Sequence, residues 1–171
     1  MTTFLRTAPL LLVALSAAAD GDTRFHADLV GTQEVPAIFT AGSATLDMRV
    51  LDNDTRIEFQ LAYENLTAPP LAAHVHFGQR GVSGGVSFFF CGGGGKPPCA
   101  GGHASGTVTA ANVVGPTTQG IAVGELNKII AAMRAGVAYA NIHTATFPGG
   151  EIRGQINFGA NNTDQGERGN D

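Results

Sequence analysis

Three histidines have the spacing expected of ligands to one metal ion. His74 and His76 are separated by one residue within the extended segment 72–77, so both imidazoles leave the same face of a strand. His143 lies in a second extended segment, residues 137–143. If the two segments are neighbours, three neutral imidazoles converge, and this ligand set suits copper or zinc. We therefore expect one metal ion, copper before zinc, bound by His74, His76 and His143.

Two other histidines are weaker candidates. His103 follows a glycine-rich stretch near Cys99 and is a candidate fourth ligand, whereas His26 lies in a separate predicted strand. Because each ligand must be neutral, binding is expected to weaken as the pH falls through the ordinary imidazole pKa of about 6.5. The alternative is a metal-free arrangement, in which the histidines hydrogen-bond to loops and pack at the rim of the fold.

A second set of polar residues is predicted to surround the ligands. Tyr139 and Asn141 alternate with His143 and therefore share its face. Arg153 lies in the segment Gly150-Glu-Ile-Arg-Gly154, and its permanent charge could guide a small anion toward the metal. A structural ion pair across strands, for example with Asp47, is the favoured role for Arg153.

The elements that position these residues are predicted to be strands. Residues 44–50 and 57–63 alternate apolar with polar side chains around the turn Asp52-Asn53-Asp54, which predicts a hairpin with one buried face. Further strands are predicted around Phe25–Leu29, Ala72–Phe77, Val86–Phe90, Ser105–Ala110, Val137–His143 and Glu151–Phe158. One helix is predicted from the spacing of Leu126, Ile129, Ile130 and Met133, ending near Gly136. This pattern predicts an all-β protein, an antiparallel sandwich with one inserted helix. We expect it to be either Greek-key and immunoglobulin-like or superoxide dismutase-like.

The two ends of the chain are predicted to lie outside the folded domain. Residues 1–19 combine Arg6, an apolar run and a small-residue cleavage pattern, which together are typical of a signal peptide. The folded domain is expected over residues 24–158. The tail, residues 159–171, has almost no apolar side chains and is expected to be disordered. We therefore expect a secreted or periplasmic protein with no transmembrane segment in its mature form.

Two cysteines fit this expectation of export. Cys91 and Cys99 flank the segment GGGGKPP, and an oxidising compartment would join them in a small ring. A pair of free buried thiols is the alternative. Two cysteines without a third or fourth make a poor zinc site.

Composition and local context exclude several functions. The chain of 171 residues has 10 Lys and Arg against 14 Asp and Glu, a net charge of −4, with no basic cluster for binding nucleic acid. The string Gly81-Val-Ser-Gly-Gly85 resembles a serine-hydrolase elbow, but a predicted strand follows it instead of a helix.

An extracellular or periplasmic partner is expected, of a kind that the sequence does not identify.

Several motifs, in this order, resemble the CHRD (chordin-type) domain. They are Gly31-Thr-Gln-Glu-Val-Pro36, Ala73-His-Val-His-Phe-Gly78, Tyr139-Ala-Asn-Ile-His-Thr144 and Pro148-Gly-Gly-Glu-Ile-Arg-Gly-Gln155. The resemblance covers residues 24–158 and implies an all-β sandwich, found in secreted bacterial proteins and in chordin. It implies little chemistry.

A fainter similarity is to Cu/Zn superoxide dismutase, which also has an H-V-H strand, a later copper histidine and an arginine near the metal. His74, His76, His143 and Arg153 occur in the matching order, but the bridging histidine and the zinc-binding cluster are missing. Three functions are therefore considered. The first is a secreted domain binding one metal ion, the second is a metal-free extracellular binding or structural module, and the third is a copper-only dismutase-like enzyme.

Overall fold

The computed structural model describes residues 23–159, which form nine strands and one α-helix. The predicted signal peptide and residues 160–171 of the predicted tail lie outside the described residues. The strands are β1 (Thr23–Val30), β2 (Ser43–Leu51), β3 (Arg56–Glu64), β4 (Pro70–Phe77), β5 (Gly85–Cys91), β6 (His103–Thr109), β7 (Ala138–Thr144), β8 (Ile152–Gln155) and β9 (Asn157–Phe158). The helix is α1 (Leu126–Arg134), and three short 3-10 turns occupy Gly31–Gln33, Ala110–Asn112 and Thr117–Gln119.

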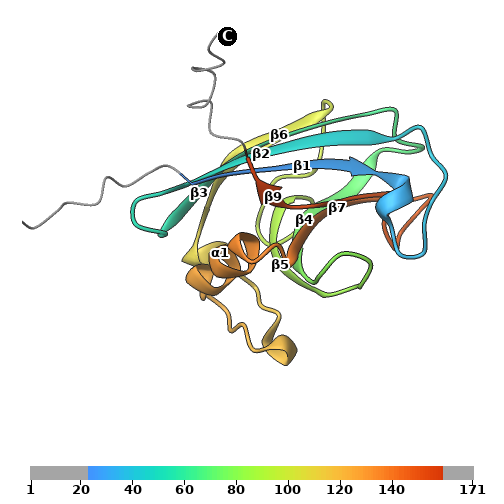
Figure 1. Ribbon diagram of the computed structural model, residues 1–171. Helices are drawn as coiled ribbons and strands as arrows, with labels where there is room; N and C mark the ends of the chain where they lie inside the picture. The colour runs from blue at the N-terminus through green and yellow to red at the C-terminus, as the bar shows by residue number, and fades with distance from the viewer. Residues whose placement is uncertain (1–22, 160–171) are drawn as a thin grey trace, which may run out of the picture.

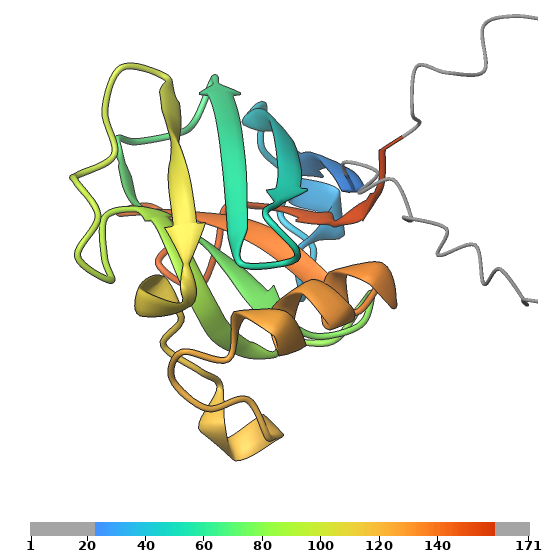
Figure 2. The ribbon, with the colours of Figure 1, turned by 90° about the vertical axis from the view of Figure 1, so that its left-hand side faces the viewer.

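The strands form one antiparallel sheet that curls into a barrel-like sandwich. Their order is β5-β4-β7-β8-β1-β2-β3-β6, and β9 pairs with β1. Figure 1 shows β1, β2, β3 and β6 in one layer above β4, β5 and β7. In the view turned by 90°, the two layers enclose the interior (Figure 2). The all-β prediction with one helix is confirmed for the part of the chain that the structure describes.

Alternation along the strands builds the interior. On the β2–β3 hairpin, the predicted apolar set faces inward, and Leu46, Ile57 and Leu61 are 0–1% exposed. The turn at residues 52–54 is in the left-handed region, which Asp and Asn tolerate better than most residues. Burial of this apolar face is the main force holding the two layers together.

The helix α1 lies at one end of the sandwich, beside the lower layer (Figures 1 and 2), and its apolar face joins the common core. Its predicted apolar face is buried, with Ile129, Ile130 and Met133 no more than 1% exposed. Gly136 has a φ of 68°, which is the left-handed conformation expected of a glycine just after a helix. The chain then turns directly into β7, which carries one of the three histidines.

One predicted strand is divided in the structure. The segment 151–158 forms β8 and β9, separated by Ile156, instead of a single strand. β8 lies between β7 and β1, whereas β9 pairs only with β1. Ile156 is fully buried and its N–H donates to Ala138 O, so the chain changes strand partners at this residue.

Candidate metal centre

The three predicted ligands lie on the outer face of two adjacent strands. β4 and β7 pair antiparallel, with His74 opposite Asn141 and His76 opposite Tyr139. The alternate residues of both strands, Ala73, Val75, Ala140 and Ile142, face the hydrophobic core. Because strand side chains alternate, the five polar side chains of these strands project from the opposite face: His74, His76, Tyr139, Asn141 and His143.

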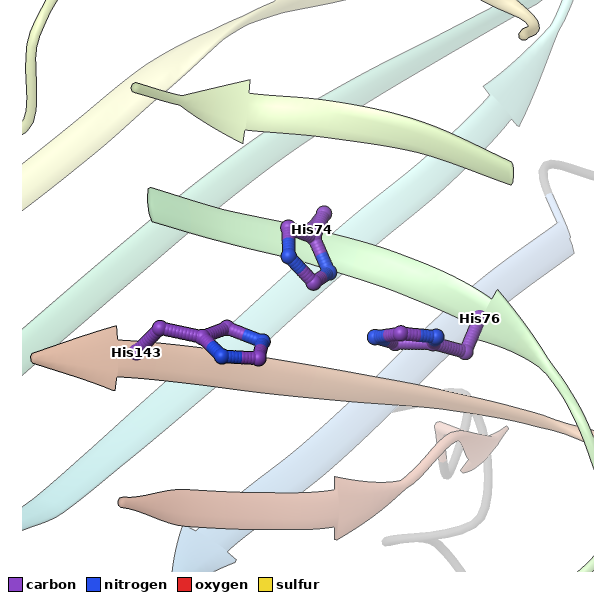
Figure 3. Close-up of side chains that lie close together, drawn as sticks. All are labelled: His74, His76 and His143. Carbon is purple, nitrogen blue, oxygen red and sulfur yellow. The ribbon is translucent and has the colours of Figure 1, made fainter. Parts of the chain in front are cut away.

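His74, His76 and His143 form a compact cluster, with their rings directed toward one another (Figure 3). One ligand nitrogen from each ring lies within 4.8 Å of the other two. A point no more than about 2.8 Å from all three nitrogens therefore exists, and a shift of under about 1 Å would give the usual metal–imidazole distance of 2.0–2.1 Å. The three residues predicted as ligands are therefore brought together.

Two of the rings have a defined tautomer. His76 Nδ1 donates to Gly84 O at 2.8 Å, and His143 Nδ1 donates to Pro148 O at 2.9 Å. A carbonyl oxygen only accepts hydrogen bonds, so each Nδ1 carries the proton and each Nε2 keeps its lone pair. His143 Nε2 and His74 Nδ1 are buried and lack a hydrogen-bond partner in the described part of the chain. Unpartnered buried nitrogens of this kind are suited to coordinate an ion.

Burial keeps the cluster uncharged. It lowers the pKa of His74 to about 3, with a further contribution from the positive charges that His76 and His143 would carry. Burial also lowers the pKa of His76 to about 4, partly offset by its bond to Gly84, and lowers that of His143. His74 and His76 therefore stay neutral well below pH 6.5, and protons compete for these two imidazoles only in more acidic solution.

Two weaker sequence candidates are not part of the cluster. Within residues 23–159, the only group of at least three metal-ligand side chains this close together contains neither His103 nor His26. His103 is exposed at the start of β6, with Nδ1 near Gly101 O. His26 lies on β1 between the carboxylates of Asp28 and Asp47. The pairing considered between Asp47 and Arg153 does not form, because Asp47 is bonded to His26 on the neighbouring strand.

Arg153, Tyr139 and Asn141 do surround the histidines. Arg153 is 2% exposed, and its guanidinium carbon lies 3.4 Å from the centre of the Tyr139 ring. The same ring stacks on His76 at 4.6 Å with an interplanar angle of 6°. Arg153 Nη2 donates to two loop carbonyls, so this cation holds a loop and is not presented to solvent.

One acidic neighbour of the site was not predicted. Glu34 is 9% exposed and accepts a hydrogen bond from Asn141 Nδ2. Burial raises the pKa of Glu34 to about 7, against the opposing effect of Arg153. The single acid within Gly31–Pro36 was the available signal in the sequence, but nothing local places that segment over β7.

Comparison with known proteins decides the family. A family model for the CHRD domain matches residues 25–156. The chain belongs to the CHRD domain family. No curated protein and no solved structure matches the chain significantly, and the similarity to superoxide dismutase gains no support from these comparisons.

The CHRD domain is an extracellular type of domain. The predicted pairing of Cys91 with Cys99 is confirmed, since the two sulfurs are bonded. A disulfide is typical of an oxidising compartment. Across residues 23–159, none of the helical segments is both long and apolar enough to cross a bilayer.

Proposed function

We propose that this CHRD domain binds one metal ion, copper before zinc, through His74, His76 and His143. The observation that carries the proposal is the convergence of one nitrogen from each of three neutral imidazoles. Two nitrogens of these rings, His74 Nδ1 and His143 Nε2, are buried without a partner among the described residues. Three protein ligands leave room for water or a small molecule at the ion.

The ligand chemistry supports the preference for copper. All three ligands are imidazoles, and no cysteine or carboxylate of the described residues belongs to the cluster. Imidazole binds both copper and zinc well, and Cu²⁺ forms the more stable complexes among divalent ions of the first transition row. A shell of three neutral ligands also suits the lower charge of Cu⁺ in a largely buried position.

Metal content and copper titration test this proposal directly. The protein is purified without a histidine tag, its metals are measured by mass spectrometry, and copper is titrated against a competing chelator at pH 7. We expect one copper per chain, and we expect His143→Ala to weaken binding by at least about 100-fold, since two imidazoles rarely form a tight site.

His26→Ala is the matched control, because it removes an imidazole from the same sheet but not from the cluster. It should bind copper like the wild type. Equal affinity in the wild type, His143→Ala and His26→Ala, or no uptake at all, would support the metal-free module instead.

We also propose that the chain is exported, with residues 1–19 removed. The pattern of those residues, the family and the disulfide support this. N-terminal sequencing of protein from the medium or the periplasm should begin near Asp20. Retention of Met1 in the exported protein would contradict cleavage.

A further inference from the structure

The loop between β4 and β5 lies against the candidate metal centre and is fixed by side chains from other strands. Arg153 Nη2, on β8, donates to Gln79 O at 3.1 Å and to Val82 O at 2.9 Å. Gln155 Nε2, also on β8, donates to Gly78 O at 3.1 Å. The backbone of residues 78–84 therefore takes its shape from β8 as well as from its own turn.

Tyr139 holds the far end of the same loop. Its hydroxyl oxygen accepts a hydrogen bond from Gly84 N at 3.1 Å. The Arg153 guanidinium lies 3.4 Å from the centre of the Tyr139 ring, and the His76 ring is stacked on it at 4.6 Å. Two groups this close cannot share one face of the ring. The guanidinium therefore lies against one face and the imidazole against the other. Tyr139 thus contacts the loop, the cation that holds the loop, and one candidate ligand.

Gly84 connects this loop to the ligand. Its N–H donates to Tyr139, and its carbonyl accepts the Nδ1 proton of His76 at 2.8 Å. A Cβ at this position would lie 1.8 Å from Phe77 O, so the backbone here approaches the end of β4 more closely than any side chain allows. Both backbone polar groups of Gly84 therefore have a partner. Its N–H is bound to Tyr139 and its carbonyl oxygen to His76.

We infer that Arg153 and Tyr139 are positioning residues that fix the tautomer and orientation of His76 through the 78–84 loop. They hold Gly84 O in place, Gly84 O holds the proton on Nδ1, and Nε2 is left with its lone pair facing His74 and His143. Histidine ligands commonly have an outer hydrogen-bond partner, and here that partner is a loop carbonyl that itself needs support. The consequence for metal affinity rests on the proposed function, whereas the tautomer does not.

His143 provides an internal control. Its Nδ1 donates to Pro148 O, in a different loop, which none of the hydrogen bonds of Arg153 or Tyr139 described above reaches. Weakening the 78–84 loop should therefore change His76 and leave His143 as it is. A general loss of stability would affect both rings alike.

Nitrogen-15 NMR of the imidazoles in the metal-free protein at pH 7.5 tests the inference. In the wild type, we expect His76 and His143 both to carry the proton on Nδ1. Tyr139→Phe removes one hydrogen bond to the loop but keeps the stacked ring, and Arg153→Lys keeps the charge but not the planar fork. In each variant, the ratio of the two His76 tautomers should shift toward Nε2–H by roughly 2- to 10-fold, the effect of weakening one hydrogen bond.

Matched variants separate positioning from stability. Tyr63→Phe removes the hydroxyl of another buried tyrosine. Arg134→Lys weakens the ion pair with Asp54, which lies away from the histidine cluster. Neither should change the tautomer of His76. An unchanged His76 tautomer in a folded Tyr139→Phe protein would overturn the inference, as would an equal shift at His143. Should Arg153→Lys fail to fold, Tyr139→Phe still decides the matter.

Copper titration of the same variants gives the second readout. We expect affinity to fall by at most about 10-fold in Tyr139→Phe and Arg153→Lys, because the fraction of His76 with its lone pair on Nε2 cannot fall by more than the shift in the tautomer ratio. If the wild type binds no copper but the tautomer of His76 shifts as described, the proposed metal site fails and the positioning role stands. If copper binding weakens while the tautomer stays unchanged, the positioning role fails.

Discussion

The imidazole of His74 shows how strongly burial, together with two neighbouring imidazoles, can lower the pKa of a titrating group. It is 6% exposed, and Phe89 packs against it edge-on with ring centres 5.0 Å apart. No carboxylate of the described residues belongs to its cluster, so nothing compensates a positive charge on the ring. The site is therefore a small buried region in which an imidazole is more stable neutral than protonated.

This exclusion of protons predicts that the metal-free domain is destabilised by mild acid. Well above pH 6.5, the imidazoles of His74 and His76 are neutral in both the folded and the unfolded chain. Below it, the unfolded chain binds protons that His74 and His76 cannot bind when folded, because their pKa values are about 3 and about 4. The free energy of unfolding should therefore decrease between pH 6.5 and 4, by roughly 2 kcal/mol for each histidine at pH 5.

Glu34 acts in the opposite direction and must be removed from the measurement. Its pKa of about 7 means that the folded chain binds a proton between pH 4.5 and 7 that the unfolded chain does not. Urea denaturation of Glu34→Gln at pH 7 and pH 5 removes this opposing contribution. Adding His76→Gln should reduce the loss at pH 5 by about half. Identical pH dependence with and without His76 would contradict the lowered pKa.

At the scale of elements, Glu151 joins three separate segments beside β8. The side chain is fully buried, and its carboxylate accepts four hydrogen bonds. Oε1 accepts from Thr40 Oγ1 and Thr67 N, while Oε2 accepts from the hydroxyls of Thr67 and Thr144. One carboxylate therefore connects the β1–β2 loop, the β3–β4 loop and the end of β7.

The geometry at Glu151 predicts a difference between two substitutions. In Glu151→Gln, the amide nitrogen can replace Oε2, because the hydroxyls of Thr67 and Thr144 can rotate to accept. We expect a loss of unfolding free energy within about 1 kcal/mol. Glu151→Ala leaves Thr67 N and the hydroxyls without their acceptor and should cost roughly 2–4 kcal/mol. Denaturant titration distinguishes the two, and similar losses in both variants would contradict this account.

The elements were more predictable than their contacts. The strand positions follow from alternating polarity, and the helix from its apolar spacing, because these patterns are local. The divided strand at Ile156 could not be predicted, since the change of partners depends on β7 and β1, which are distant in sequence. The same limit applies to Glu34, whose position over β7 depends on the path of a long loop.

For the candidate site, the grouping of the three histidines was predictable, because period-two spacing places them on one face and β4 and β7 are neighbours. The role of Arg153 was not predicted in detail. Its partners are backbone carbonyls of Gln79 and Val82, and a sequence carries no pattern for contacts with main-chain atoms. The contacts of Gly84 could not be predicted for the same reason, because it binds His76 and Tyr139 through its main chain.

At the scale of the whole molecule, the disulfide lies at the seam of the barrel. β5 and β6 are the first and last strands of the sheet, and Cys91 ends β5 while Cys99 precedes β6. Phe90 of β5 and Phe59 of β3 are in ring contact across the interior, at 4.8 Å between centres. The bridge therefore orders the connection between the two edges of one sheet.

Removing this bridge should weaken the fold moderately and leave the histidines in place. The cysteines are 8 residues apart, and closing a ring of this size contributes roughly 2–3 kcal/mol by the chain-entropy account. In a Cys91→Ala/Cys99→Ala double variant, urea denaturation should show a loss in that range, with copper affinity within about threefold of the wild type. A 100-fold loss of affinity would show that the seam, and not only β4 and β7, shapes the site.

The core and the candidate site use alternate residues of the same two strands. On β4 and β7, Ala73, Val75, Ala140 and Ile142 fill the interior, while the histidines between them face outward. Substitutions on one face therefore leave the other face chemically intact. Replacing the three histidines would change the candidate site without changing the residues of these strands that fill the interior. The fold and the candidate ion site are thus carried by different residues, so membership in the CHRD family does not by itself establish that a domain binds an ion.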